Sequence, residues 1–132
     1  VFAVNGDDGY PYAIPVNFYY DEADNKIYFH GAGAGYKFDA LQNDNKICFT
    51  VYGNETIKEE EPWAPYMQSV VIFGKCRVLD DMNRTIQLTR KVAQKYYPDE
   101  KFIDEEIAKA GKAVCVYEIT IEHMSGKQIQ EK

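Results

Sequence analysis

Alternation of apolar and polar side chains runs through most of this chain and constrains its fold more than any other feature. In residues 11–20, "PYAIPVNFYY", every second position from Tyr12 to Phe18 carries a large apolar side chain. Because successive side chains of a strand point to opposite faces, this spacing predicts a strand. The same pattern predicts strands at residues 1–4, 26–30, 46–53, 67–79 and 113–124. The total is about six strands, with a hairpin turn at "DEADN" and a loop at residues 54–65.

Helical spacing is confined to three segments between these strands. Residues 80–100 begin at an Asp cap, carry Met82, Ile86, Ala93 and Tyr96 at helical spacing, and end at Pro98. A second, short helix is predicted at residues 104–111, ended by a glycine, and a third at residues 36–44. Since strands dominate and no repeating strand–helix–strand rhythm exists, we predict an antiparallel barrel with helices at its periphery.

The length and charge of the chain narrow its class. A chain of 132 residues is long enough for one domain with its own core, so we expect residues 1–132 to form a single domain. The net charge of -6 disfavours a nucleic-acid surface, and no apolar run approaches the roughly 18–20 residues of a membrane span. The chain opens without Met inside the strand-like "VFAV", so we expect a preceding segment, such as a helix, to be missing.

The cysteines indicate a reducing compartment. Cys48, Cys76 and Cys115 stand singly inside apolar strand-like runs, without C-x-x-C spacing. A redox dithiol or a zinc site needs clustered thiolates, and His123 has no matching partner for a metal pair. We therefore expect reduced thiols in a cytoplasmic protein with no metal site.

A glycine-rich loop, "FHGAGAGYKFDAL" at residues 29–41, separates a predicted strand from a predicted helix. Its glycines at 31, 33 and 35 do not fit the G-x-G-x-x-G dinucleotide fingerprint, because the third comes one residue early. A Walker loop also fails, since Tyr36 separates Gly35 from Lys37 and Phe38 stands where a hydroxyl is needed. Neither common nucleotide motif is present.

The chemistry of this loop still favours an anion. Glycines allow the backbone to approach a ligand, and the first helical turn presents unpaired N–H groups. Lys37 places a cation at the positive end of the helix dipole, a conflict that one monophosphate would relieve. The alternative is an ordinary strand-to-helix loop with an exposed lysine.

Two residues of the first long pattern stand out. Pro15 interrupts a strand pattern, which argues for an edge, a bulge or a ligand contact. Asn17 places an amide among aromatic residues, which suits recognition of a flat heteroaromatic ring or, alternatively, the capping of a bulge.

Together these motifs resemble a known family. The linked patterns P-x-x-x-P-x-N-F, Y-F-H-G-A, G-Y-K and S-V-x-x-x-G occur in order along nearly the whole chain, which closes with "IEHMSGK". This arrangement resembles the nitroimidazole-resistance group of the pyridoxamine 5'-phosphate oxidase-like split barrels. The resemblance implies a six-stranded antiparallel Greek-key split barrel, and a homodimer that holds FMN at its interface.

The resemblance also implies a set of cofactor-binding residues. Ile14, Pro15, Val16 and Asn17 would follow the isoalloxazine ring. The ribityl chain and phosphate would be flanked by His30 and Gly31, and the phosphate held by Tyr36 and Lys37. Gln68 and Ser69 would approach the ring or the dimer interface, and Trp63 or Tyr66 of the partner subunit would cap the ring. No catalytic side chain is implied.

The expected activity follows from these assignments. The resemblance favours an FMN-dependent oxidoreductase that reduces small aromatic acceptors, namely nitroimidazoles, other nitroaromatics or quinones. Oxidation of pyridoxamine 5'-phosphate is disfavoured, because "PYAIPVNF" lacks basic residues and the chain ends "EHMSGKQIQEK". Lys37 is also nearly the only basic residue in the phosphate site that the resemblance implies.

Two alternatives remain from the sequence. One is a non-catalytic flavin or haem carrier or sensor on the same barrel, with His30 or His123 as axial ligand; the other is a barrel without cofactor.

A dimer is expected on separate grounds, because the aromatic residues around "EPWAPYMQSVVIF" would otherwise leave apolar surface exposed.

Overall fold

The computed structural model describes residues 1–58, 61–110 and 114–130; the side chains of residues 58, 61–65, 110 and 130 lie outside the description. The strands are β1 (Phe2–Asn5), β2 (Pro11–Ile14), β3 (Tyr19–Asp21), β4 (Lys26–Ala32), β5 (Lys46–Lys58), β6 (Glu61–Val78) and β7 (Val114–Gln130). The helices are α1 (Tyr36–Asn43), α2 (Met82–Tyr96) and α3 (Glu100–Ala110), with a short 3-10 turn, η1, at Asp7–Gly9.

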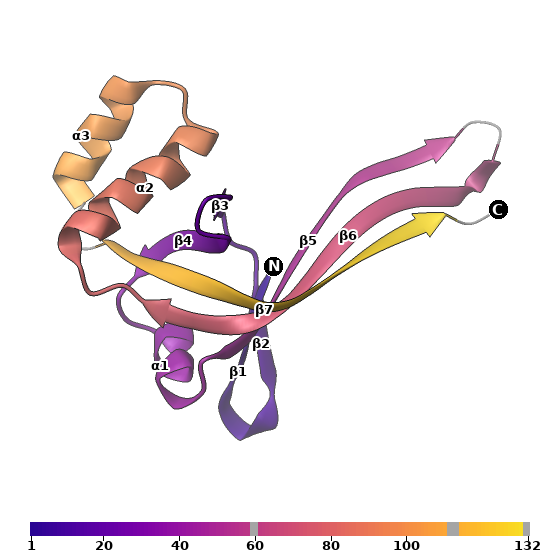
Figure 1. The fold of residues 1–132 in the computed structure, drawn as a ribbon, viewed down its shortest axis with the longest axis horizontal. Helices are drawn as coiled ribbons and strands as arrows, with labels where there is room; N and C mark the ends of the chain where they lie inside the picture. The colour runs from indigo at the N-terminus through magenta and orange to yellow at the C-terminus, as the bar shows by residue number, and fades with distance from the viewer. Residues whose placement is uncertain (59–60, 111–113, 131–132) are drawn as a thin grey trace.

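The strands form one antiparallel sheet in the order β2-β1-β5-β6-β7-β4-β3. Its edge strands β2 and β3 are consecutive in the chain, joined only by residues 15–18. Five residue steps span at most about 17 Å, whereas the edges of a flat sheet of this size would stand about 29 Å apart. The sheet must therefore curl until its edges approach, which makes a split barrel (Figure 1). The predicted mainly β class is confirmed, with seven strands in place of six.

The additional strand arises where one strand was expected from residue 11 to residue 20. That prediction was wrong, because β2 stops at Ile14 and β3 starts at Tyr19. Pro15 has no N–H to donate to a ladder, so the pairing ends there. β3 then forms the predicted hairpin with β4, with Tyr19 opposite Tyr28.

The loop expected at residues 54–65 is largely strand. β5 continues to Lys58 and β6 begins at Glu61, and a register shift between Gly53 and Thr56 keeps the two strands paired. With the outer part of β7 they form a three-stranded arm that projects from the barrel (Figure 1). Polar composition had suggested a loop, but pairing between β5 and β6, with Ile57 opposite Pro65, supports a strand here, and β7 joins from Tyr66 inward.

The barrel interior is filled by apolar side chains from most strands and from α1. Phe2, Phe29, Phe49 and Tyr117 are fully buried there, and Leu41 of α1 packs against them. The predicted alternation in β6 is confirmed, since Ile72 and Cys76 face this core. The opposite face of β4 carries Tyr28, which packs with Val116 and with Leu88 of α2. β4 therefore has one face toward the barrel interior and one toward the helices.

Helix α2 begins where the sequence predicted, because the Asp81 side chain accepts hydrogen bonds from the N–H groups of Asn83 and Arg84. The predicted helix is present, and its buried residues are Thr85, Leu88 and Val92, whereas Met82 and Tyr96 are exposed. The glycine expected to end α3 lies outside the described residues.

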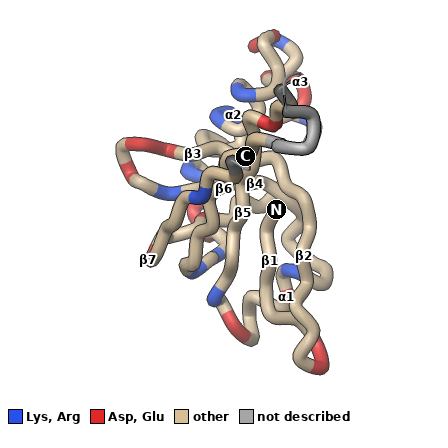
Figure 2. The backbone as a smooth tube through the Cα atoms, turned by 90° about the vertical axis from the view of Figure 1, so that its right-hand side faces the viewer, with Lys and Arg blue, Asp and Glu red and all other residues tan. Residues whose placement is uncertain are grey.

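Charged side chains do not form a single basic face. Lys and Arg residues are interspersed with Asp and Glu along the tube (Figure 2). Among the described residues, no helix is long and apolar enough to cross a membrane.

Candidate functional site

A gap in the pairing of β4 defines the split in the barrel. β4 pairs with β7 along its whole length, from Lys26 to Ala32. On its other side it pairs with β3 only as far as Tyr28. Within the described sheet, residues 29–32 therefore present a free strand edge, and the unpaired segment 15–18 bridges to β2. Free backbone groups at such an edge offer hydrogen bonds to a bound molecule.

The glycine-rich loop adjoins this edge and ends at the N-terminus of α1. Gly35 is the N-cap, with φ +112°, a conformation that favours glycine, and no side chain caps the helix. The first intrahelical bond runs from the N–H of Asp39 to the carbonyl of Gly35. The preceding N–H groups of the first turn are thus available to a ligand.

Lys37 turns back from α1 toward the barrel. Its side chain is half-buried, and a methyl group placed on Gly31 would lie 3.0 Å from Lys37 Nζ. The ammonium also lies 5.0 Å from the centroid of the Tyr117 ring. Among the described residues no carboxylate pairs with Lys37. A partly desolvated cation without a counter-ion favours binding of an anion.

Tyr117 of β7 supports this end of the barrel from beneath. Its ring is fully buried and stacks on Phe29 at a centroid distance of 4.8 Å. Its hydroxyl donates to the carbonyl of Ala32 at 2.6 Å, and burial raises the pKa of Tyr117 to about 12. Tyr117 therefore stays a hydrogen-bond donor that fixes the start of the glycine loop. No sequence signal indicated this role, because the alternating pattern of β7 does not distinguish Tyr117 from an ordinary core residue.

Gly33 is required by the same close packing. A methyl group on Gly33 would lie 2.6 Å from Cys115 Sγ, well inside van der Waals contact. The three cysteines are free thiols, with Cys76 buried and the other two half-buried. The loop thus has a steric as well as a conformational need for glycine.

Tyr36 is engaged elsewhere than its neighbour Lys37. Its hydroxyl accepts a hydrogen bond from the N–H of Asp7 at 2.7 Å, and its ring contacts Tyr12 at a centroid distance of 4.6 Å. Tyr36 therefore anchors the turn between β1 and β2 to the start of α1. The structure brings Gly31 and Lys37 together but directs the Tyr36 hydroxyl to this turn.

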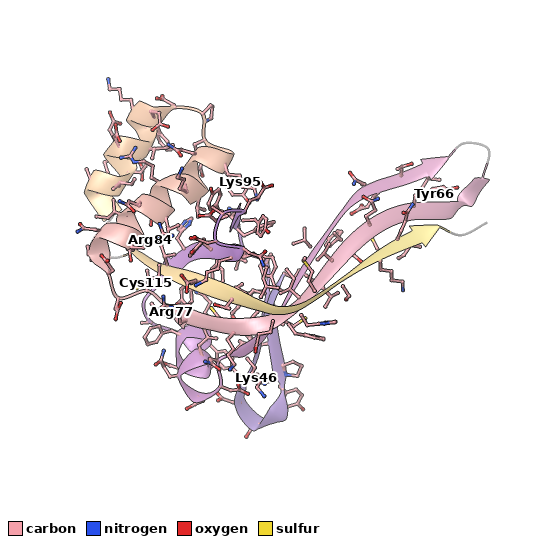
Figure 3. The ribbon with its side chains drawn as sticks, in the orientation of Figure 1. Lys46, Tyr66, Arg77, Arg84, Lys95 and Cys115 are labelled. Carbon is pink, nitrogen blue, oxygen red and sulfur yellow. The ribbon has the colours of Figure 1, made fainter. Side chains whose placement is uncertain are left out.

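Segment 15–18 is held from outside the sheet by the last turn of α2. The N–H of Phe18 donates to the Tyr96 hydroxyl at 3.2 Å, and the Phe18 carbonyl accepts from Lys95 Nζ at 2.8 Å. Lys95 Nζ also lies 3.6 Å from the Phe18 ring centroid, and Figure 3 shows Lys95 beside β3. Sequence reasoning missed both α2 residues, because only the tertiary fold brings them to this segment.

Within segment 15–18 the side chains take different directions. Val16 packs against the barrel core together with Ile14, whereas Pro15 is exposed. The Asn17 side chain lines a cavity on the helix side of the sheet, and His30 lines the same cavity. Partial burial lowers the pKa of His30 from its ordinary value, which favours the neutral imidazole near pH 7.

The remaining predicted residues lie on the arm. Gln68 pairs with Gly53 across the β5–β6 ladder and accepts a hydrogen bond from Asn54 Nδ2 at 2.6 Å. Ser69 follows in the same ladder, and Tyr66 lies farther out (Figure 3). No hydrogen bond or ion pair in the described part of the chain joins Gln68 or Ser69 to the residues around the split. The Trp63 side chain lies outside the description.

The described residues contain no group of three or more His, Cys, Asp or Glu side chains placed to hold a metal ion.

This fold defines a class: antiparallel split barrels with a glycine loop and a short helix at the open edge. The sequence model described as pyridoxamine 5'-phosphate oxidase matches residues 1–128. The chain therefore belongs to the pyridoxamine 5'-phosphate oxidase-like family. A comparison with curated proteins gave no match.

Solved structures share the fold. A protein from Bacteroides thetaiotaomicron, assigned to 5-nitroimidazole antibiotic resistance, is 23% identical with a TM-score of 0.79, covering 98% of this chain and 75% of that one. A flavocytochrome from Azotobacter vinelandii is 25% identical with a TM-score of 0.72, covering 96% and 60%. An FAD-binding protein from Mesorhizobium loti is 17% identical with a TM-score of 0.61, covering 99% and 83%. The chain is similar to all three in the arrangement of its strands.

Proposed function

We propose that this protein binds FMN at the split of the barrel and reduces small aromatic acceptors such as nitroimidazoles, other nitroaromatics or quinones. One observation carries the proposal: Lys37 is half-buried, its ammonium has no carboxylate partner among the described residues, and it belongs to the first turn of α1, whose N-terminus is uncapped. A phosphate monoester complements both groups, because it is anionic and accepts several hydrogen bonds.

The rest of the split fits the remaining parts of FMN. Gly31 leaves room beside Lys37, and the backbone of His30 and Gly31 borders the free edge of β4. Ile14, Pro15, Val16 and Asn17 border the opposite side, where backbone groups would meet the polar edge of the ring. In this proposal Tyr36 contributes its backbone N–H, since its hydroxyl is bonded to the Asp7 amide.

A homodimer is part of the proposal. The outer face of β5 and β6 exposes large apolar side chains, including Tyr52 at 58% and, where these strands meet the barrel, Phe73 at 55%. The β5–β6 register puts both on one face, since Tyr52 is opposite Ser69 and Cys48 is opposite Phe73. Burying this face against a second copy would remove apolar surface from water. It would bring Ser69, which shares the face, toward the second subunit's split, with Gln68 beside it on the opposite face of β6.

The names of the similar proteins support flavin chemistry. One is FAD-binding, one is a flavocytochrome, and one is assigned to nitroimidazole resistance. Bound FMN would supply the redox chemistry, while this chain binds, orients and shields it from water. Reduction of a quinone to a hydroquinone takes up two electrons and two protons. We propose a reduced nicotinamide as the donor, which supplies both electrons and one proton as a hydride, while solvent supplies the second proton. We also propose that residues 1–132 form one flavin-binding domain. Its cysteines are free thiols, which supports a cytoplasmic location.

A second candidate is a non-catalytic flavin or haem carrier. The observation in its favour is the His30 imidazole, which lines a cavity and makes no hydrogen bond to another described residue. The two candidates differ in turnover, because a carrier would retain its ligand without passing electrons to an acceptor.

A reoxidation experiment separates these candidates. The FMN-loaded protein is reduced anaerobically and mixed with a nitroimidazole or a quinone while the flavin absorption band is followed. The proposal predicts that the bound flavin reoxidises at least about tenfold faster than free reduced FMN under the same conditions. Equal or slower reoxidation would favour the carrier.

A further inference from the structure

A cavity of about 280 Å³ lies between the α2–α3 hairpin and the outer face of the sheet. Its floor includes His30 of β4 and Val114 of β7, and its walls include Ala93 of α2 and Ile103 of α3. The aromatic side chains of Tyr96, Tyr97 and Phe102 are partly exposed and line the cavity as well, so it is open to solvent.

This cavity is separate from the end of the barrel where Lys37 lies. His30 and Gly31 are neighbours in β4, so their side-chain directions are opposite. Gly31 faces Lys37 and Tyr117 at the barrel interior, whereas His30 faces the helices with Tyr28 and Val116. A molecule whose phosphate lies at Lys37 would therefore leave this cavity free for a second molecule.

The cavity nevertheless adjoins the split. Asn17 belongs to the bridging segment and His30 to the free edge of β4, and both residues line the cavity. Tyr96 contributes its ring to the cavity and its hydroxyl to the backbone of Phe18. A ligand in the cavity would thus contact the residues that form two borders of the split.

The size of the cavity and the charges of its lining residues restrict which ligands it can bind. Its volume is near the lower limit of about 300 Å³ for ligand pockets, which suits a single ring. Among the described lining residues, Glu106 is the one acidic side chain, and no lysine or arginine contributes. Neither the Asn17 amide, the His30 imidazole nor the Glu106 carboxylate has a hydrogen-bond partner in the described part of the chain. These groups remain available to polar atoms on a ring.

We propose that this cavity is the acceptor pocket, and that it binds an uncharged or cationic single-ring aromatic molecule between the α2–α3 hairpin and His30. This inference rests on the proposed function, since it places the acceptor beside the proposed flavin site. It assigns to α2 and α3 the selection of substrate, and to Glu106 the exclusion of anionic rings.

The experiment measures binding of two probes to flavin-free protein by ligand-observed NMR: a neutral nitroimidazole and 4-nitrobenzoate. We expect the neutral probe to bind and the carboxylate to bind at least about tenfold more weakly. Ala93→Phe fills the cavity and should abolish binding of the neutral probe, whereas Ala108→Phe, at an exposed position of α3 outside the cavity, should not. Equal probe binding by the Ala93→Phe protein would overturn the inference.

A charge-reversed variant tests selection without altering the packing. Glu106 is exposed on α3, so Glu106→Arg should fold normally and should shift preference toward 4-nitrobenzoate. Glu105→Arg, at the neighbouring exposed position outside the cavity, is the matched control. Unchanged preference in Glu106→Arg would contradict the assignment of Glu106.

FMN titration of the same samples keeps the two proposals apart. Probe binding without FMN binding would contradict the flavin proposal, while the cavity would still be shown to bind a small ring. FMN binding with no affinity for either probe would sink the acceptor pocket alone.

Discussion

A methyl group on Gly31 would lie 3.0 Å from Lys37 Nζ and 3.4 Å from Lys37 Cε. β4 and the first turn of α1 therefore lie in contact where Gly31 adjoins the Lys37 ammonium. The ammonium also lies 5.0 Å from the centroid of the Tyr117 ring. This contact couples the free edge of β4 to the proposed phosphate site.

Gly31→Ala should weaken FMN binding more than it weakens the fold. The added methyl displaces the flexible end of the Lys37 side chain. The fold tolerates this displacement, but the displaced ammonium lies farther from the phosphate of bound FMN. We expect FMN affinity to fall by roughly tenfold, about 1.4 kcal/mol. Isothermal titration and urea unfolding measure the two effects. Gly53→Ala, where a methyl would meet open space, is the control and should change neither.

Tyr96→Phe should loosen segment 15–18. It removes the hydroxyl that bonds the Phe18 backbone and should cost about 0.5–1.5 kcal/mol of unfolding free energy. Faster amide exchange at Phe18 should accompany this loss. Tyr97→Phe is the matched control, because the Tyr97 hydroxyl has no hydrogen bond within the described residues and only its ring contacts Phe102. Equal effects of the two substitutions would contradict the account.

Glu118 joins three neighbouring strands. Its Oε1 accepts from Arg77 Nε at 2.8 Å and from Lys26 Nζ at 3.3 Å, while its side chain is only 6% exposed. Burial by itself would raise the pKa of Glu118, but the hydrogen bonds from Arg77 and Lys26 outweigh it and hold the pKa below the ordinary 4.5. The ionised form is therefore stabilised by folding.

The pH dependence of Glu118→Gln follows from this direction. A carboxyl with a lowered folded-state pKa contributes its stability above pH 4.5 and loses it as the pH falls through the folded-state value. At pH 7 the variant should be less stable by about 1–3 kcal/mol, and the difference should shrink below pH 4.5. Urea unfolding across pH measures it. Glu122→Gln, at an exposed position of β7, should show no such dependence.

The sequence predicted those features that depend on local chemistry. The β3–β4 hairpin, α1 and the Asp81 cap of α2 were all visible, because turn residues and caps act on their own neighbours. The break at Pro15 was noticed but not recognised as the end of a strand. The extension of β5 and β6 could not be read from residues 54–65, because its support comes from pairing between strands.

The candidate site was predictable to a similar extent. Glycines and a lysine between a strand and a helix indicated an anion site, and the structure brings Gly31 and Lys37 together. That His30 and Gly31 face opposite sides of β4 follows from strand alternation. The sequence does not show that α2 and α3 cover the His30 side and so form the cavity. Tyr117 and Tyr96 reach the site from β7 and α2, which no local pattern reveals.

The arm provides a test of the proposed dimer. Phe73→Glu places a charge on the exposed apolar face, where Phe73 stacks on His123 at a centroid distance of 6.1 Å. We expect light scattering to show a dimer for the unaltered chain and a monomer for the variant. Lys101→Glu, at an exposed position of α3 rather than on this face of the sheet, is the control for added negative charge. A monomeric unaltered chain would contradict the shared interface.

The proposed role of Lys37 in holding the FMN phosphate is tested by the affinity of the Lys37→Ala protein for FMN and for riboflavin, which lacks the phosphate. Lys46→Ala, at an exposed lysine on β5, removes the same charge elsewhere (Figure 3). We predict that the unaltered chain and Lys46→Ala bind FMN alike. Lys37→Ala should bind FMN at least about tenfold more weakly, with riboflavin affinity unchanged. If the unaltered chain does not bind FMN, or if Lys37→Ala binds FMN as tightly as the unaltered chain, the proposed phosphate site is contradicted.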